Sequence, residues 1–240
     1  MKKIIGSLII SGCVLVGCQS PEDLEENWTE YIQEGSENLE SYSSDTDIRV
    51  SVSLGPDNVV EEDELKIVIS IVGDLDKGYS VEENVAGLSQ EVFFEGNDFY
   101  LKENENWTHY PDAGPIEYAP WYPNVVESLI EIEDLMEASH SGDVLVLSYE
   151  GNDREVWEAF EEEFSLSISG VSEENITMTL EATMDDSTYY LQDLSLNIVG
   201  EESDGDMEIG RVTIIVEAQY TDHDTVDLTD VEEEIANDVE

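Results

Sequence analysis

The sequence predicts an α+β protein in which one curved antiparallel sheet carries helices on its concave face. Apolar residues first recur at the spacing of a helix and then alternate with polar residues in several separate runs. Gly, Pro, Asn and Asp residues stand between those runs, as they do in tight turns. Hydrophobic residues make up 40% of the 240 residues, which suits one domain with a sizeable core.

Residues 21–39 form the first predicted helix. Pro21 stands just before its first turn, and the acidic residues that follow favour the positive end of the helix dipole. Its apolar residues share one helical face: Leu24, Trp28, Tyr31, Ile32 and Leu39. Alternation then predicts strands at 48–54 and 65–71, with a turn at 55–58 between them.

An aromatic hairpin is expected next. Its two strands flank residues 95–98, and residues 107–110 continue it. A Pro-rich aromatic loop at 111–123 leads to a second helix, for which Asn124 is the expected N-cap. The apolar face of that helix comprises Val125, Leu129, Ile132, Leu135 and Met136.

A short strand at 144–149 precedes a third helix, which begins at 151–153. The apolar residues of that helix are Val156, Trp157, Phe160 and Phe164. Three strands close the sheet, at 176–184, 189–199 and 207–220. The tail at 221–240 has only a weak apolar pattern, so we expect an ordered edge followed by a frayed end.

The first residues resemble the signal peptide of a bacterial lipoprotein. Lys2 and Lys3 precede an apolar run over 4–16, which is shorter than the ~20 residues of a membrane-spanning helix. The run ends in Leu15-Val16-Gly17-Cys18, which looks like a lipobox. Cys18 is therefore expected to carry the lipid and to begin the mature chain. The alternative is an ordinary signal peptide or an uncleaved anchor.

This interpretation divides the chain into a signal peptide (1–17), a lipidated tether (18–21), a folded domain (22–220) and an acidic tail (221–240). Two acyl chains such as palmitate anchor a protein stably, whereas one holds it only marginally. The tether reaches only ~10–15 Å, so we expect the domain to lie close to the extracytoplasmic face of the cell membrane. Cys13 lies in the segment to be removed, so no disulfide can form within the mature chain.

The charge of the chain is strongly negative. The formal net charge is -52, and removal of Lys2 and Lys3 takes it to -54. Such a surface repels nucleic acid and anionic headgroups, so nucleic acid is excluded as a partner. Abundant acidic residues with very few lysines favour a halophilic or haloalkaliphilic source, in which salt screens the charges. Binding of multivalent cations is the alternative interpretation of the acidity.

The segments 94–101 and 107–111, together with Leu39-Glu40-Ser41-Tyr42 before a long strand, resemble a known group. They look like the uncharacterised Gram-positive lipoproteins whose fold is similar to LolA and to the mycobacterial LppX-like proteins. The resemblance implies an open half-barrel of about ten or eleven strands, with helices in its concave face. In relatives that carry lipid, the cavity between sheet and helices holds acyl chains. The extreme acidity and the scarcity of lysine depart from this group.

Motifs for catalysis or metal binding are not apparent. His109, His140 and His223 are scattered, and the sequence contains no P-loop, G-x-S-x-G or G-x-G-x-x-G motif. Acidic turns at 74–78 and 204–206 could hold calcium, but neither fits the twelve-residue calcium loop. We therefore expect no enzymatic activity, no catalytic or metal residues and no cofactor.

The leading hypothesis is a membrane-anchored monomer that binds or carries a lipid or acyl chain in the half-barrel. The residues expected to line the cavity are Ile67, Ile69, Phe93 and Phe99, with Trp121 and Tyr122 at its mouth. The alternative is an envelope interaction or sensor module in which the helices fill the cavity and a surface binds another protein. The volume and polarity of the space between sheet and helices distinguish these two hypotheses.

Overall fold

A computed structural model describes residues 21–54, 59–73, 76–103, 105–113, 120–168, 171–202 and 210–239. Within these residues the strands form one antiparallel sheet of 11 strands in the order β6-β5-β4-β3-β2-β1-β11-β10-β9-β8-β7. The sheet is open, because β6 and β7 lie at opposite edges. The predicted fold class, an α+β protein with a single open antiparallel sheet, is confirmed.

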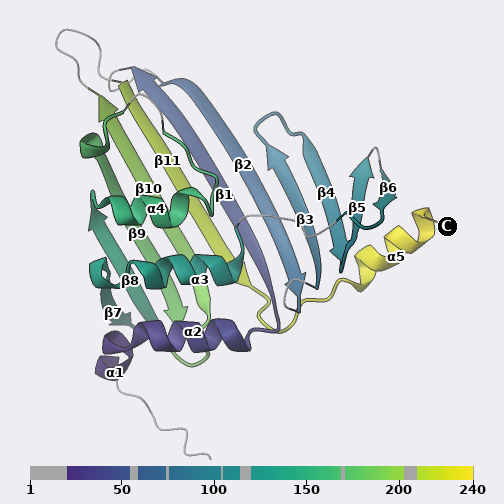
Figure 1. Ribbon diagram of the computed structural model, residues 1–240, viewed down its shortest axis with the longest axis horizontal. Helices are drawn as coiled ribbons and strands as arrows, with labels where there is room; N and C mark the ends of the chain where they lie inside the picture. The colour runs from purple at the N-terminus through teal and green to yellow at the C-terminus, as the bar shows by residue number, and fades with distance from the viewer. Residues whose placement is uncertain are drawn as a thin grey trace, which may run out of the picture.

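The strands form two meanders that meet in the middle of the sheet (Figure 1). The first meander contains β1 (Ser41–Leu54), β2 (Val59–Val72), β3 (Lys77–Asn84), β4 (Ser89–Glu95), β5 (Asp98–Glu103) and β6 (Asn106–Tyr110). The second contains β7 (Glu137–Ser141), β8 (Val144–Gly151), β9 (Ile176–Asp185), β10 (Leu191–Glu202) and β11 (Gly210–Thr221). The first and last strands pair, with Ile48 opposite Val216, so the two meanders share one continuous sheet.

Three helices lie across one face of the sheet, which we call the helix side (Figure 1). They are α2 (Trp28–Asn38), α3 (Tyr122–Glu131) and α4 (Arg154–Glu161), and α3 packs between the other two. A short helix, α1 (Pro21–Glu26), precedes α2 and packs against β7. The expected helix at 21–39 is thus present as two pieces. Helix α3 lies in the connection between the two edge strands, β6 and β7, and α4 lies in the connection between the adjacent strands β8 and β9.

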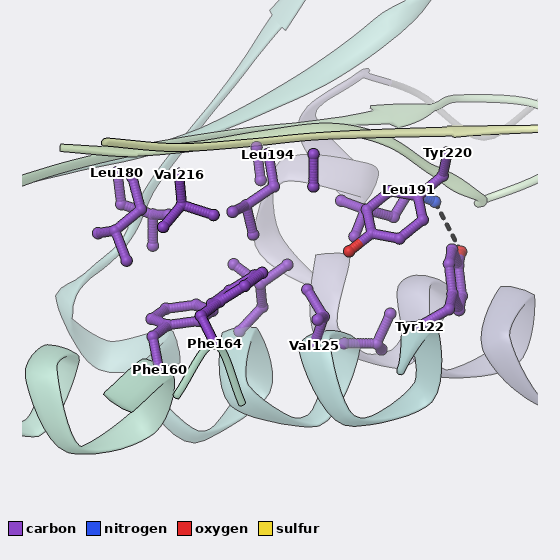
Figure 2. Packing of buried hydrophobic residues seen from close by; sticks show 14 of the residues in the cluster. Tyr122, Val125, Phe160, Phe164, Leu180, Leu191, Leu194, Val216 and Tyr220 are labelled. Atoms are coloured by element: carbon purple, nitrogen blue, oxygen red, sulfur yellow. Dashed lines mark hydrogen bonds between the residues drawn. The ribbon is translucent and has the colours of Figure 1, made fainter. Parts of the chain in front are cut away.

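The main core lies between these helices and the sheet. Figure 2 shows side chains of the helices that point toward Leu194 and Val216 on the strands. They are Val125 on α3, Phe160 on α4 and Phe164 in the turn that follows α4. The largest side chains that are fully buried in this layer include Tyr122, Phe160, Ile32 and Leu129. Apolar side chains therefore fill the space beneath α2, α3 and α4.

The second helix differs from its predicted bounds. Trp121, and not Asn124, occupies the N-cap position, and Pro123 stands in the first turn, where a missing N–H is tolerated. The helix ends at Glu131, and a 3₁₀ turn at Glu133–Leu135 follows. The next residues form β7, which the sequence did not predict because Glu137–Ser141 carries small and polar side chains on both faces.

The tail also differs from its predicted state. Residues Thr229–Asp238 form a helix, α5, near β5 and β6 (Figure 1). It packs against Phe93, whose neighbour Phe94 belongs to the main core, so α5 lies on the other side of the sheet, which we call the outer face. Leu228 and Ile235 pack there against Phe93 and Trp107 in a separate small core. The expected ordered edge and frayed end are replaced by this docked helix, whose apolar residues follow helical spacing.

Candidate functional site

The sheet continues past α4 on the helix side (Figure 1). An apolar groove lies there, between the strands and the turn after α4. Its volume is about 390 Å³, within the ~300–1,000 Å³ range of small-molecule sites. The apolar lining residues come from three strands and from the turn after α4: Ile48, Val50, Val52, Leu65, Ile214, Phe164 and Leu166. The groove is thus a continuation of the main core toward solvent.

Strand geometry explains the floor of the groove. Side chains alternate between the two faces of a strand, so Ile48, Val50 and Val52 all point to the helix side. The register sets Val50 opposite Ile214 on β11 and opposite Asp63 on β2, which makes one row across three strands. Exposure rises along this floor, because Ile214 is 1% exposed and Ile48 is 7% exposed, whereas Val50 is only half-buried.

The turn after α4 forms one wall of the groove. The N–H of Leu166 donates to the carbonyl oxygen of Glu161 at 2.7 Å, and the N–H of Ser165 donates to that of Glu162 at 3.2 Å. Ser165 has a φ of +51°, so these bonds form a Schellman motif with serine where glycine is usual. The motif ends the helix and places Leu166 over the floor of the groove.

A second groove of about 380 Å³ lies on the other side of this turn. It is lined by Trp157 of α4, Met178 of β9 and the segment after Leu166, and Leu166 and Ser167 border both grooves. Arg154 and Glu158 stand at its rim and form an i,i+4 ion pair. This groove is more polar than the first, because charged side chains of α4 face it.

The residues expected to line a cavity lie elsewhere. Ile67 and Ile69 are buried in the main core beneath the helices, and none of the six residues lines the groove of about 390 Å³. Phe99 pairs with Phe94 on the helix side and is half-buried. Phe93 lies on the outer face under α5, because adjacent residues of a strand point to opposite sides.

Trp121 and Tyr122, expected at the mouth of the cavity, are buried at the start of α3. The hydroxyl oxygen of Tyr122 accepts a hydrogen bond from the N–H of Leu191 at 2.8 Å (Figure 2). The N–H of Tyr122 donates to the hydroxyl oxygen of Tyr42 at 3.1 Å, and the N–H of Trp121 donates to the carboxylate of Glu163 at 2.9 Å. Burial raises the pKa of both tyrosines above its usual range, so they act as neutral packing and hydrogen-bonding groups.

Val50, Val52 and Leu166 are groove residues that the sequence did not single out. The alternation of β1 predicted that Val50 and Val52 share a face with Ile48, and this part of the prediction is confirmed. The signal for Leu166 is weak, because it follows α4 in a turn with no glycine. The position at which α4 crosses the sheet decides which residues of β1 are left uncovered by helices. No local sequence pattern indicates that position.

The described residues contain no group of three or more His, Cys, Asp or Glu side chains placed to hold a metal ion. His109 lies 3.2 Å from Asp98, whereas His140 lies 3.4 Å from Glu25, in a different part of the fold. Asp74, Leu75 and residues 204–206 of the two calcium candidates fall outside the described residues.

The signal peptide and Cys18 also fall outside the described residues. Among the helices that the structure describes, none combines the length and the apolar character needed to cross a membrane.

The sequence matches no family model and no curated protein. Among solved structures, the chain is similar to the lipoprotein LppX of Mycobacterium tuberculosis, with 10% identity and a TM-score of 0.35 over 87% of this chain and 98% of that one. It is also similar to LprF of Mycobacterium bovis, with 12% identity and a TM-score of 0.38 over 83% and 93% of the two chains. A LolA superfamily protein of Nitrosomonas europaea shares 14% identity and a TM-score of 0.26 over 86% and 96%.

Proposed function

We propose that the protein is a lipoprotein of the cell envelope that holds one alkyl chain of an amphiphile in the groove of β1, β2 and β11. The observation that carries the proposal is the half-buried apolar floor formed by Val50, Val52 and Leu65, which continues from a fully buried core. Apolar side chains at the edge of a core are partly exposed to solvent, and their burial by an alkyl chain is energetically favourable. In this proposal, the alkyl chain covers the apolar side chains that are exposed at this end of the core.

The size of the groove sets the expected affinity. An alkyl chain that buries about eight methylene groups gains roughly 6 kcal/mol, at ~0.8 kcal/mol for each group. That free energy corresponds to a dissociation constant of about 40 μM, before the ordering of the chain is subtracted. The site therefore suits reversible binding of one chain. A deeper site is blocked, because Phe160 and Tyr122 fill the layer beneath the helices.

Anchoring through Cys18 is the second part of this proposal, and it follows from the lipobox. A chain with a net charge of -54 after cleavage is repelled by anionic headgroups, so the lipid is the feature that holds the domain at the bilayer. The variant Cys18→Ala should move from the membrane fraction to the soluble fraction. Tight membrane binding by that variant would contradict the lipobox.

Blocking the groove tests the ligand. In the full chain with Cys18→Ala, the substitution Val50→Trp fills the floor, whereas Ser51→Trp adds the same ring to the outer face of the same strand. Val50→Trp should weaken binding of a fluorescent hexadecyl probe at least tenfold, and Ser51→Trp should leave it unchanged. Equal effects of the two variants, or no binding by the parent protein, would overturn the proposal. Mass spectrometry of lipid extracted with the purified protein identifies the natural ligand.

The filled layer beneath α2, α3 and α4 favours a second candidate, an envelope interaction or sensor module. In that case the fold presents a surface to another protein and the groove stays unoccupied. Capture of one stoichiometric envelope protein, together with no recovered lipid and no probe binding, would favour this function over the first.

A further inference from the structure

We infer that the groove selects amphiphiles with a cationic head, such as an alkyl amine or a quaternary ammonium, over fatty acids and other anionic lipids. This inference rests on the proposed function, because it names the class of molecule that the same groove accepts. Two observations carry it. The charged group at the rim of the groove is acidic, and the Lys and Arg side chains of the described residues are paired with carboxylates away from the groove.

Two charged residues border the groove, Asp63 and Glu64, and both are acidic. Glu64 is paired with Arg49, so its side chain lies on the outer face, and Asp63 supplies the carboxylate on the helix side. Asp63 is paired with Val50, so its side chain stands on the helix side at the rim of the floor. It is exposed, and within the described residues its carboxylate accepts one hydrogen bond, from the N–H of Glu64 at 3.0 Å. An exposed carboxylate at the end of an apolar floor is placed to meet a cationic head while the alkyl chain lies on Val50 and Val52.

The cation nearest in sequence to the floor points away from it. Arg49 precedes Val50, so it lies on the outer face, where its guanidinium pairs with Asp47 and Glu217. Lys66 is likewise on the outer face and pairs with Asp45 at 3.1 Å. Neither side chain is available to an anionic head on the helix side.

The remaining cations of the described residues also have carboxylate partners. Lys77 and Lys102 each bridge a strand and α5, Arg154 pairs with Glu158, and Arg211 pairs with Glu201. An anionic head in the groove would therefore face Asp63 without a positive group to neutralise it. Asp63 would attract a cationic head and repel an anionic head. The binding free energies of the two heads would therefore differ by twice the interaction energy between one unit charge and Asp63.

Head-group selectivity can be measured with three probes that share a hexadecyl chain. Hexadecanoate, a neutral monoacylglycerol of the same chain and hexadecyltrimethylammonium are titrated below their micelle concentrations into the full chain carrying Cys18→Ala. We expect the cationic probe to bind about tenfold more tightly than the anionic probe at 0.1 M salt. The ratio should fall to about twofold at 1 M salt, where the Debye length is ~3 Å.

Two charge variants separate the groove from the general acidity of the surface. Asp63→Asn removes the carboxylate at the rim, whereas Glu62→Gln removes one from the adjacent residue on the outer face. Asp63→Asn should reduce the ratio at least threefold, and Glu62→Gln should leave it within a factor of about 1.5. Val50→Trp should abolish the tight component for all three probes, which excludes adsorption of the cationic probe to the acidic surface.

The outcomes distinguish this inference from the function on which it rests. Equal binding of the three probes, all blocked by Val50→Trp, would overturn the selectivity and leave the alkyl site intact. Equal losses with Asp63→Asn and Glu62→Gln would assign the preference to the overall charge and also overturn the inference. If no probe binds, the proposed function itself is wrong.

Discussion

The two faces of the sheet are covered in different ways. On the helix side, α2, α3 and α4 bury a continuous apolar layer, and its polar links include hydrogen bonds of tyrosines, one glutamate and one serine. On the outer face, α5 covers part of the first meander with a small apolar cluster and a set of ion pairs. In this acidic chain, a large buried apolar area holds α2, α3 and α4 on the helix side, whereas ion pairs with the few cations hold α5 on the outer face.

Two of the three lysines that follow residue 20 form ion pairs with α5 on the outer face. Lys102 pairs with Glu91 on β4 at 3.1 Å and with Glu234 on α5 at 2.9 Å. Lys77 joins Glu95 at 3.0 Å and also Glu232 on the helix. Each lysine therefore lies between two carboxylates that would otherwise repel each other, which allows an acidic helix to dock on an acidic sheet.

The largest effect should come from the helix side. Phe160→Ala removes a fully buried ring beside Phe164 and should lower the free energy of unfolding by about 3–5 kcal/mol, measured by urea denaturation. Ile235→Ala on α5 should lower it by only about 1–2 kcal/mol, since that side chain is 7% exposed in a small cluster that can relax. Equal losses would show that the two covers are equally important to the fold.

The sequence predicted the helix side better than the outer face, for a physical reason. The strands β1, β2, β9, β10 and β11 alternate polar and apolar residues, so their face toward the core can be read locally. Five of the ten residues of α5 are acidic, and its partner Phe93 lies far away in the sequence. The docking of α5 depends on which strand face Phe93 occupies, and the pair Phe93-Phe94 gives no local indication of that face.

The same limit applies to the site. Alternation placed Val50 and Val52 on the core face, but it could not show that α4 crosses the sheet before reaching them. Trp121 and Tyr122 look like a mouth in a Pro-rich loop, yet hydrogen bonds to Glu163, Tyr42 and Leu191 hold them in the core. The positions of the helices over the sheet, which decide what remains open, arise from contacts between distant segments.

A smaller effect should distinguish a lysine that bridges to α5 from one that pairs only with a strand. Lys102→Gln removes two ion pairs and a cation–π contact with Trp107 at 5.5 Å, so the opening free energy of α5 should fall by ~1 kcal/mol. Amide hydrogen exchange in α5 would then rise about fivefold. The difference should shrink at 1 M salt, because screening weakens exposed pairs.

The matched control for that change is Lys66→Gln, which alters the net charge by the same amount. Lys66 forms an exposed pair with Asp45 on β1 and does not contact α5, so exchange in α5 should stay within a factor of about two. If both variants accelerate exchange in α5 equally, the net charge and not the lysine bridge holds the helix.

The smallest effect should appear as a pH dependence on the helix side. Burial raises the pKa of Glu163 above its usual range, although the N–H of Trp121 and the side chain of Asn124 oppose this shift. The folded state therefore binds the proton more tightly than the unfolded state does. The contribution of this group to stability is fully present below about pH 4.5, the unfolded value, and declines as the pH rises through the folded pKa.

Glu163→Gln tests this sign, because the amide oxygen still accepts the hydrogen bond from Trp121 and carries no charge. The free energy of unfolding of the variant should exceed that of the parent by less than ~1 kcal/mol at pH 7, and the gap should close as the pH falls toward 4.5. Urea denaturation at a series of pH values measures it. Glu161→Gln, an exposed residue at the end of α4, is the control and should show no such trend. A gap that widens toward low pH would mean that the charged form of Glu163 stabilises the start of α3.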